Sequence, residues 1–202
     1  PIMVPEVLQC LDPRPGDVVV DCTLGHGGHA AAFLTRIGPD GLLLGLDADG
    51  VELDRTRARL LTECTATLRT CHANFEAIRG VLWGEGIAAV DVIFADLGVS
   101  SMQVDDPARG FSYKSDGPLD MRMDHRARQT VADLVATRSV TDLALALRDL
   151  ADEEDASAVA EAIVAARTRR PILTTAQLAH VVLAAKGLSW RGWREALMAA
   201  PN

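Results

Sequence analysis

The chain has 202 residues, of which 49% are hydrophobic and 24% are charged, as in ordinary folded globular proteins. Its net charge of −8, from 28 acidic and 20 basic residues, excludes an indiscriminate polyanion binder, because phosphate contacts need lysine and arginine. No apolar run approaches the ~20 residues of a membrane span, and the start lacks the basic and apolar regions of a secretory signal.

Strand and helix patterns alternate through the first half of the chain. Apolar runs of strand length predict buried strands over residues 17–23, 41–47 and 90–95, and residues 68–72 form a weaker strand candidate. Amphipathic runs predict helices over residues 5–11, 31–37, 51–61 and 75–83, the third with Leu53, Leu60 and Leu61 facing inward. This alternation predicts half of a doubly wound parallel α/β sheet.

The first strand runs directly into the glycine turn LGHGGHA. Gly25, Gly27 and Ala30 satisfy G-x-G-x-x-A in a strand–turn–helix context, where the helix N-terminus offers N–H groups to an anionic ligand. The second strand ends at Asp47, at about the distance along the chain where an acid accepts hydrogen bonds from a ribose. NAD-dependent dehydrogenases and S-adenosylmethionine methyltransferases both begin in this way.

Residues 96–124 read DLGVSSMQVDDPARGFSYKSDGPLDMRMD and follow the fourth strand directly. The stretch is polar and rich in glycine, but it places apolar residues at intervals, which indicates an ordered loop. Because open α/β sheets carry their chemistry at the carboxyl ends of the strands, the sequence predicts the functional site here.

The second half of the chain is predominantly helical. Helices are predicted over residues 143–150, 156–169 and 176–185, and a last short helix is predicted to hold Trp190 and Trp193. Arginine is concentrated in two places, at Arg109, Arg122, Arg126 and Arg128, and again at Arg167, Arg169 and Arg170. The four cysteines (Cys10, Cys22, Cys64, Cys71) lack CxxC spacing and predict buried reduced thiols in a cytoplasmic protein, with no metal site.

Four motifs suggest a family. DxTLGxGGH at 21–29, GLDAD at 45–49, NF at 74–75 and the 96–124 stretch closely resemble the bacterial 16S rRNA (cytosine-N4)-methyltransferases, over most of residues 1–183. The resemblance implies S-adenosyl-L-methionine-dependent methylation of the exocyclic amine of a cytidine, with the small ribosomal subunit and its 16S rRNA as partners and no membrane. It also implies a Rossmann-like class I methyltransferase sheet in residues 1–122 and an appended helical substrate-recognition domain in residues 123–202.

Matching positions carry the family's functional residues over to this chain. The implied cofactor contacts are Gly27, Gly28, His29, Asp47, Phe75, Asp96 and Gln103. Asp47 would hold the ribose hydroxyls and Phe75 would pack on adenine, whereas Asp96, or a backbone carbonyl near it, would accept a hydrogen bond from the cytosine amine. Candidate phosphate contacts are Arg109, Lys114, Arg122 and Arg126, each of which has a neighbouring aspartate as an alternative partner.

The sequence departs from the family in two places. The acidic segment 152–156 lacks the aromatic and arginine residues that usually surround it, and the HPATR motif and the strands that follow it are absent up to Asn202. The sheet is therefore expected to be incomplete within this chain, with an exposed edge at the fourth strand, marginal stability, weak activity and a tendency to self-associate.

Two other functions stay open at this point. A dinucleotide-dependent oxidoreductase is favoured by the glycine turn and Asp47, but the sequence shows no evident hydride-transfer group such as a tyrosine–lysine pair, and its sole tyrosine is Tyr113. A non-catalytic binding module that keeps the cofactor fold is the other alternative, because of the missing strands.

Overall fold

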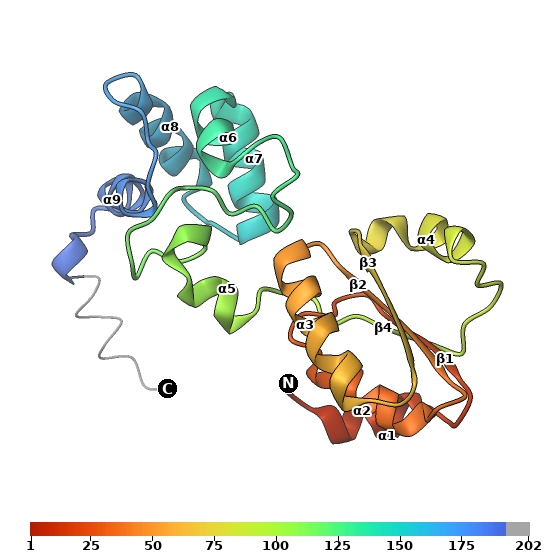
Figure 1. Ribbon diagram of the computed structural model, residues 1–202. Coiled ribbons are helices and arrows are strands. Elements are labelled where there is room, and N and C mark those ends of the chain that lie inside the picture. Colours follow the sequence, from red (N-terminus) through yellow and green to blue (C-terminus); the bar gives the residue numbers. More distant parts are fainter. Residues whose placement is uncertain (193–202) are drawn as a thin grey trace. The chain divides into compact units, whose positions relative to one another are not determined.

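The computed structural model describes residues 1–192, which form two compact units that divide between Gly98 and Val99 (Figure 1). Unit 1 comprises residues 1–98 and unit 2 begins at Val99. The predicted Trp193 falls outside the described residues, whereas Trp190 begins a helical turn.

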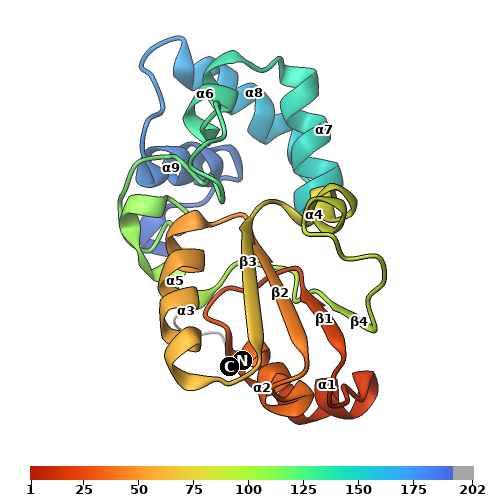
Figure 2. The same cartoon turned by 45° about the vertical axis from the view of Figure 1, so that its right-hand side comes forward.

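Unit 1 is built on a parallel sheet of four strands in the order β3-β2-β1-β4 (Figure 2). The strands are β1 (Val18–Asp21), β2 (Leu42–Asp47), β3 (Thr67–His72) and β4 (Val92–Phe94). Register pairs Val19 of β1 with Leu43 of β2 on one side and with Val92 of β4 on the other. The predicted α/β class and all four strands are confirmed, although β1 and β4 are shorter than their apolar runs.

Helices cover both faces of this sheet because its strands are apolar at consecutive positions. Val19 lies on the face covered by α1 (Val4–Leu11), α2 (Gly28–Ile37) and α3 (Gly50–Glu63). Val20, on the next position of β1, lies on the opposite face with α4 (Ile78–Gly84), which follows the 3-10 turn η1 (Phe75–Ala77). Alternate residues of a strand point to opposite faces, so a continuous apolar run supplies two cores.

Several side chains of unit 1 that were predicted to be buried are not. Leu53 and Leu60 are buried as expected, but Leu61 is 54% exposed, because it follows Leu60 around the helix by one position and leaves the inward face. Of the four cysteines predicted to be buried, Cys22 is buried, Cys64 and Cys71 are half-buried and Cys10 is exposed. In β4 the side chain of Ile93 is 52% exposed, and β4 pairs only with β1 among the described residues.

The described part of unit 2, residues 99–192, consists of helices and loops. Its elements are α5 (Ser101–Asp105), the 3-10 turn η2 (Pro107–Arg109), α6 (Val131–Thr137), α7 (Val140–Ala151), α8 (Ala156–Arg167) and α9 (Thr175–Ala185). Thr174 and Gln177 form a capping box at the start of α9, and Ser139 caps α7. The core gathers Leu119, Val135, Leu143, Val159, Ala160, Ile163 and Ile172.

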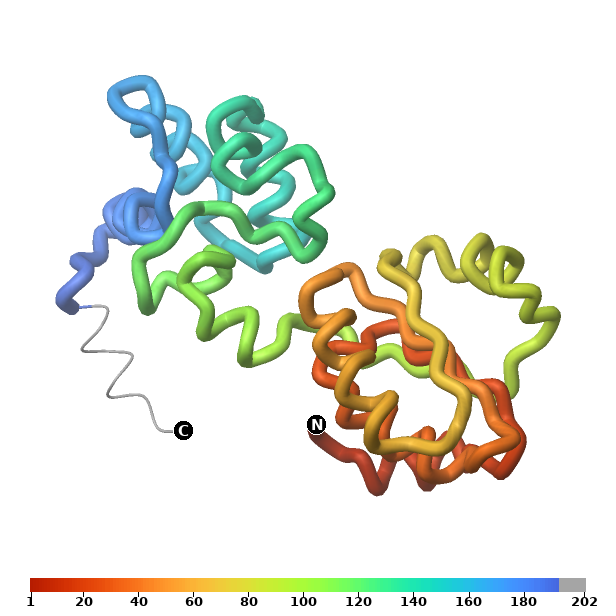
Figure 3. The backbone as a smooth tube through the Cα atoms, viewed as in Figure 1, coloured from red at the N-terminus to blue at the C-terminus, as the bar shows by residue number. Residues whose placement is uncertain are grey.

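The loop between α5 and α6 is part of this helical unit and passes the start of α9 before it enters α6 (Figure 3). The N–H of Leu119 donates to the Leu173 carbonyl at 2.9 Å, and the N–H of Thr175 donates to the Gly117 carbonyl at 3.0 Å. Leu119 is 2% exposed. By contacts the chain therefore divides at residue 98, although the predicted functional domains, 1–122 and 123–202, stay a prediction.

Candidate functional site

Three carboxylates lie at the carboxyl ends of neighbouring strands in unit 1. Asp21 is the last residue of β1 and Asp47 the last residue of β2. Asp21 pairs in register with Phe94 of β4, and Asp96 follows Phe94 by two residues. Because the strands are parallel, the three acids come to the same edge of the sheet, where open α/β sheets bind ligands.

The glycine turn is clamped to this edge by Asp47. One oxygen of Asp47, Oδ2, accepts the Gly25 N–H at 2.7 Å, and the other, Oδ1, accepts the Asp49 N–H at 2.8 Å. The Thr56 hydroxyl donates to the Gly25 carbonyl at 2.6 Å. A Cβ at Gly27 would lie 2.6 Å from the Thr56 methyl group, so the turn can approach α3 this closely only with glycine there.

The N-terminus of α2 points into the same region. Its N-cap, Gly27, has φ +67° and offers no side-chain cap, and the first-turn N–H groups of Gly28, His29 and Ala30 have no acceptor within residues 1–192. The His29 ring is turned elsewhere, with Nε2 3.0 Å from the Ile2 carbonyl and its centroid 4.7 Å from that of Phe94. The His29 side chain is therefore engaged with Ile2 and Phe94, and its role as a cofactor contact stays a prediction.

Asp21 was not predicted from the sequence as a site residue, although it opens the DxTLGxGGH motif. It is 1% exposed, and its Oδ1 accepts the Thr23 N–H at 3.0 Å. Burial raises its pKa from 3.8 to about 7, and the charges of Asp47 and Asp96 add to that rise. A strongly perturbed carboxyl group beside two others is typical of a functional site, because such a group responds to a bound cation.

Thr23 links the first strand to the fourth. Its hydroxyl oxygen accepts the Asp96 N–H at 2.8 Å, which fixes the point where the chain leaves β4. Asp96 itself is exposed. Phe75, in η1 after β3, is 44% exposed, and the N–H of nearby Ala73 donates to the Asp47 carbonyl at 3.0 Å. The structure thus brings Gly27, Gly28, His29, Asp47, Phe75 and Asp96 into one unit, at one edge of its sheet.

Gln103 belongs to unit 2. It is 6% exposed, and its Oε1 accepts the Ser100 N–H at 2.9 Å in a capping box at the start of α5. That contact explains the residue locally by helix capping. Its role as a cofactor contact stays a prediction.

The predicted phosphate contacts in unit 2 are largely engaged inside the unit. Arg109 is 9% exposed and donates from Nη2 to the Arg122 and Met123 carbonyls. Arg122 holds Asp120 through two hydrogen bonds of 2.7 Å, which keep the pKa of that carboxyl below its usual value. Arg126 pairs with Asp124 at 2.8 Å. Of the four, Lys114 is exposed and has no salt bridge within residues 1–192.

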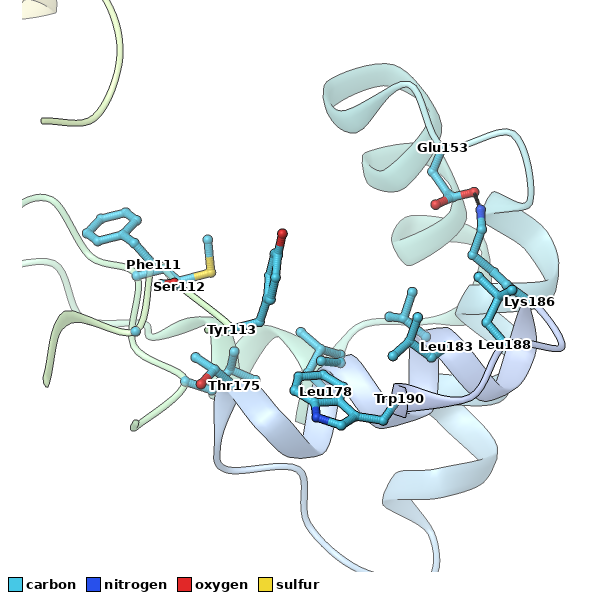
Figure 4. A pocket seen from close by; sticks show the side chains of 15 residues that line it. Phe111, Ser112, Tyr113, Glu153, Thr175, Leu178, Leu183, Lys186, Leu188 and Trp190 are labelled. Carbon is cyan, nitrogen blue, oxygen red and sulfur yellow. Dashed lines mark hydrogen bonds and ion pairs between the residues drawn. The ribbon is translucent and has the colours of Figure 1, made fainter. Parts of the chain in front are cut away.

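Unit 2 also contains an apolar cavity of about 440 Å³ between the 110–121 loop and α9 (Figure 4). Tyr113, Leu178 and Trp190 line it, and Lys186 and Glu153 form an ion pair at one end. None of the predicted site residues lines this cavity. It therefore adds a feature that the sequence patterns did not indicate.

Residues 1–192 contain neither a cluster of metal-ligating side chains nor a helix that could span a membrane. Three acids reach the same sheet edge in unit 1, but no three or more histidine, cysteine, aspartate or glutamate side chains in this range are arranged so that they could hold a metal ion. No helix in the same range has the length and apolar character needed to cross a bilayer.

Comparison with known proteins places the chain in a family. The model of the MraW methylase family matches residues 1–192. The chain is similar to proteins named "Ribosomal RNA small subunit methyltransferase H": 45% identical over 181 residues in Syntrophotalea carbinolica, 43% over 187 in Symbiobacterium thermophilum and 44% over 191 in Geotalea uraniireducens. These alignments cover 90%, 92% and 95% of this chain but only 57%, 58% and 60% of those proteins. The chain belongs to the MraW methylase family, and it spans less than two thirds of these relatives.

Proposed function

We propose that this protein is an S-adenosylmethionine-dependent methyltransferase that methylates the exocyclic N4 of a cytidine in small-subunit (16S) rRNA. The observation that carries the proposal is the meeting of Asp21, Asp47 and Asp96 beside a clamped glycine turn in unit 1. Its relatives are named as small-subunit rRNA methyltransferases, which supports the reaction class. The partner is then the small ribosomal subunit in the cytoplasm.

The residues at this edge fit such a cofactor. S-adenosylmethionine carries a cationic sulfonium and ammonium group and an anionic carboxylate. The buried Asp21, whose pKa is raised to about 7, is the kind of group that a cation stabilises in its ionised form. The N–H groups of Gly28 and His29 at the start of α2 fit the carboxylate. Asp47 would accept from the ribose hydroxyls, and Phe75 would pack on adenine.

The bound cofactor supplies a methyl group on a positively charged sulfur. The cytosine amine is a weak nucleophile because its lone pair is delocalised into the ring. Asp96 is exposed at the strand end, with its backbone N–H fixed by Thr23, and would accept an N–H hydrogen bond that favours the developing lone pair. Most of the rate would come from holding the amine in line, since effective molarities reach ~10⁵ M or more.

Calorimetric titration should show that S-adenosylmethionine binds and that NAD does not. Replacing Asp47 with alanine should weaken binding by ~1–3 kcal/mol, because ribose hydroxyls and the Gly25 N–H lose their acceptor. Asp54→Ala is the matched control, since Asp54 is an exposed acid in α3 and its removal changes the net charge equally. Binding of NAD would favour the oxidoreductase alternative, and binding of neither cofactor would favour a module without catalysis.

Methyl transfer should be detected on small ribosomal subunits and mapped to a cytosine N4. A short naked RNA should be a poor substrate, because a chain of net charge −8 has few cations to hold phosphate without further contacts. Mass spectrometry of nuclease-digested rRNA identifies the modified nucleoside, with Asp96→Asn as the inactive control. Methylation at carbon 5 of the base, or equal turnover on a short oligonucleotide, would contradict this proposal.

A further inference from the structure

The three arginines of unit 2 that were predicted to contact phosphate all bind groups within the protein. Other basic side chains of the unit are therefore better placed to bind phosphate. Arg109 bonds to backbone carbonyls, and Arg122 and Arg126 pair with aspartates. Within residues 99–192 the basic side chains without any hydrogen-bond or acidic partner are Lys114, Arg128, Arg138, Arg169 and Arg170. Three of these five lie at one place in the fold.

The place is where the ends of α6 and α8 meet. Arg167, the last residue of α8, donates from Nη1 to the Val135 carbonyl at 2.6 Å and to the Arg138 carbonyl at 2.7 Å. These bonds hold Arg138 beside the turn that carries Arg169 and Arg170. All three arginines are exposed, whereas the Arg167 side chain is half-buried and fixes the end of α8 to the end of α6.

The acids around this place do not neutralise it. The Asp133 carboxylate of α6 accepts hydrogen bonds from the N–H and the hydroxyl of Thr130, and these bonds lower its pKa. The carboxylate is therefore already bound at the start of α6. Asp142, in the first turn of α7, lines a second cavity together with Arg138 but forms no salt bridge with it. Three exposed arginines at this junction of α6 and α8 thus have no acidic partner within residues 1–192, on a chain of net charge −8.

We propose that this arginine surface, Arg138 with Arg169 and Arg170, holds the phosphate backbone of the rRNA substrate. The inference rests on the proposed function, and it moves the main phosphate contact from the 109–126 loop to the end of α8. A guanidinium group binds phosphate through two parallel hydrogen bonds, which suits arginine better than lysine for this task. The structural alternative is that Arg169 and Arg170 only complement the negative end of the α8 dipole.

The test compares two triple variants of the full chain. Arg138→Gln/Arg169→Gln/Arg170→Gln removes the arginine surface, whereas Arg36→Gln/Arg57→Gln/Arg79→Gln removes three exposed arginines of unit 1 that likewise lack partners among the described residues. Binding to isolated, unmethylated small ribosomal subunits is measured against salt concentration. Loss of three contacts should raise Kd at 0.15 M salt on the order of 50-fold and reduce the logarithmic salt slope by about 2.

We expect this loss for the arginine-surface variant only, with affinity for S-adenosylmethionine unchanged. The corresponding triple lysine variant keeps the charges and should recover most of the salt slope, whereas a merely structural role would show as a lower unfolding temperature in the glutamine variant. Equal losses in both glutamine variants, or unchanged binding in the first, would overturn the inference. Absence of methylation by the wild-type protein would instead contradict the proposed function, so the two failures are distinct.

Discussion

Asp21→Asn should make the protein more stable at neutral pH, by about 4 kcal/mol in the free energy of unfolding. Burial raises the pKa of Asp21 from 3.8 to about 7, and each unit of that rise corresponds to about 1.4 kcal/mol. Between these pH values the folded protein holds a proton that the unfolded chain has lost, so wild-type stability falls as pH rises. Denaturant unfolding at several pH values measures the difference between wild type and variant.

The difference should be small near pH 4, grow up to about pH 7 and stay constant above it. Asp54→Asn is the control, because Asp54 is an exposed acid and its replacement changes the net charge by the same amount. The same Asp21 variant should bind S-adenosylmethionine more weakly, since it has lost a carboxylate near the proposed cationic ligand. A variant that is no more stable at pH 8 than the wild type would show that Asp21 is not held in an unfavourable ionised state.

Gly110→Ala should destabilise the protein by more than about 3 kcal/mol. Gly110 has φ +72°, and a Cβ there would lie 2.1 Å from the Pro118 carbonyl oxygen. That oxygen is backbone in the same loop, so it cannot rotate away as a side chain would. The expected result is a large drop in the denaturant midpoint of unit 2, followed by the fluorescence of Trp190.

Gly187→Ala separates the steric clash from the backbone conformation. Gly187 has φ +69°, nearly the same as Gly110, but a Cβ there would meet nothing within 4 Å. Its replacement should cost only about 1 kcal/mol, the penalty for a left-handed L-residue. If both substitutions lower the free energy of unfolding equally, the close approach of Gly110 to the Pro118 carbonyl adds no steric penalty to the alanine variant.

The sequence predicts the sheet of unit 1 well because its signals are local. Strands such as Leu42–Asp47 are continuous apolar runs bounded by turn residues, and the glycine turn joins β1 to α2 in the expected manner. Asp47 and Asp96 follow from the rule that ligands bind at strand ends. The hydrogen bond from the Gly25 N–H to the Asp47 carboxylate could not be predicted, because it depends on the three-dimensional position of the glycine turn relative to the end of β2.

In unit 2 the sequence was less informative, for reasons of length and partner choice. The short helix α5 has one turn and lacks the repeats from which periodicity is read. Arginines near aspartates predicted either phosphate contacts or internal pairs, and only the fold shows that Arg122 pairs with Asp120. The attachment of the 110–121 loop to α9 depends on contacts across about 60 residues, such as Thr175 with Gly117, which no local pattern carries.

The strand order of unit 1 has a consequence for folding during synthesis of the chain. β1 lies between β2 and β4 in the sheet and precedes both in the sequence, so it is synthesised before either of the strands that flank it. At translation rates of roughly 5–20 residues per second, the chain from Asp21 to Val92 takes on the order of ten seconds to appear. During that interval one edge of an apolar strand stays open in the nascent chain. The length of the segment that carries β2, β3 and α4 therefore determines how long a chaperone would have to shield it.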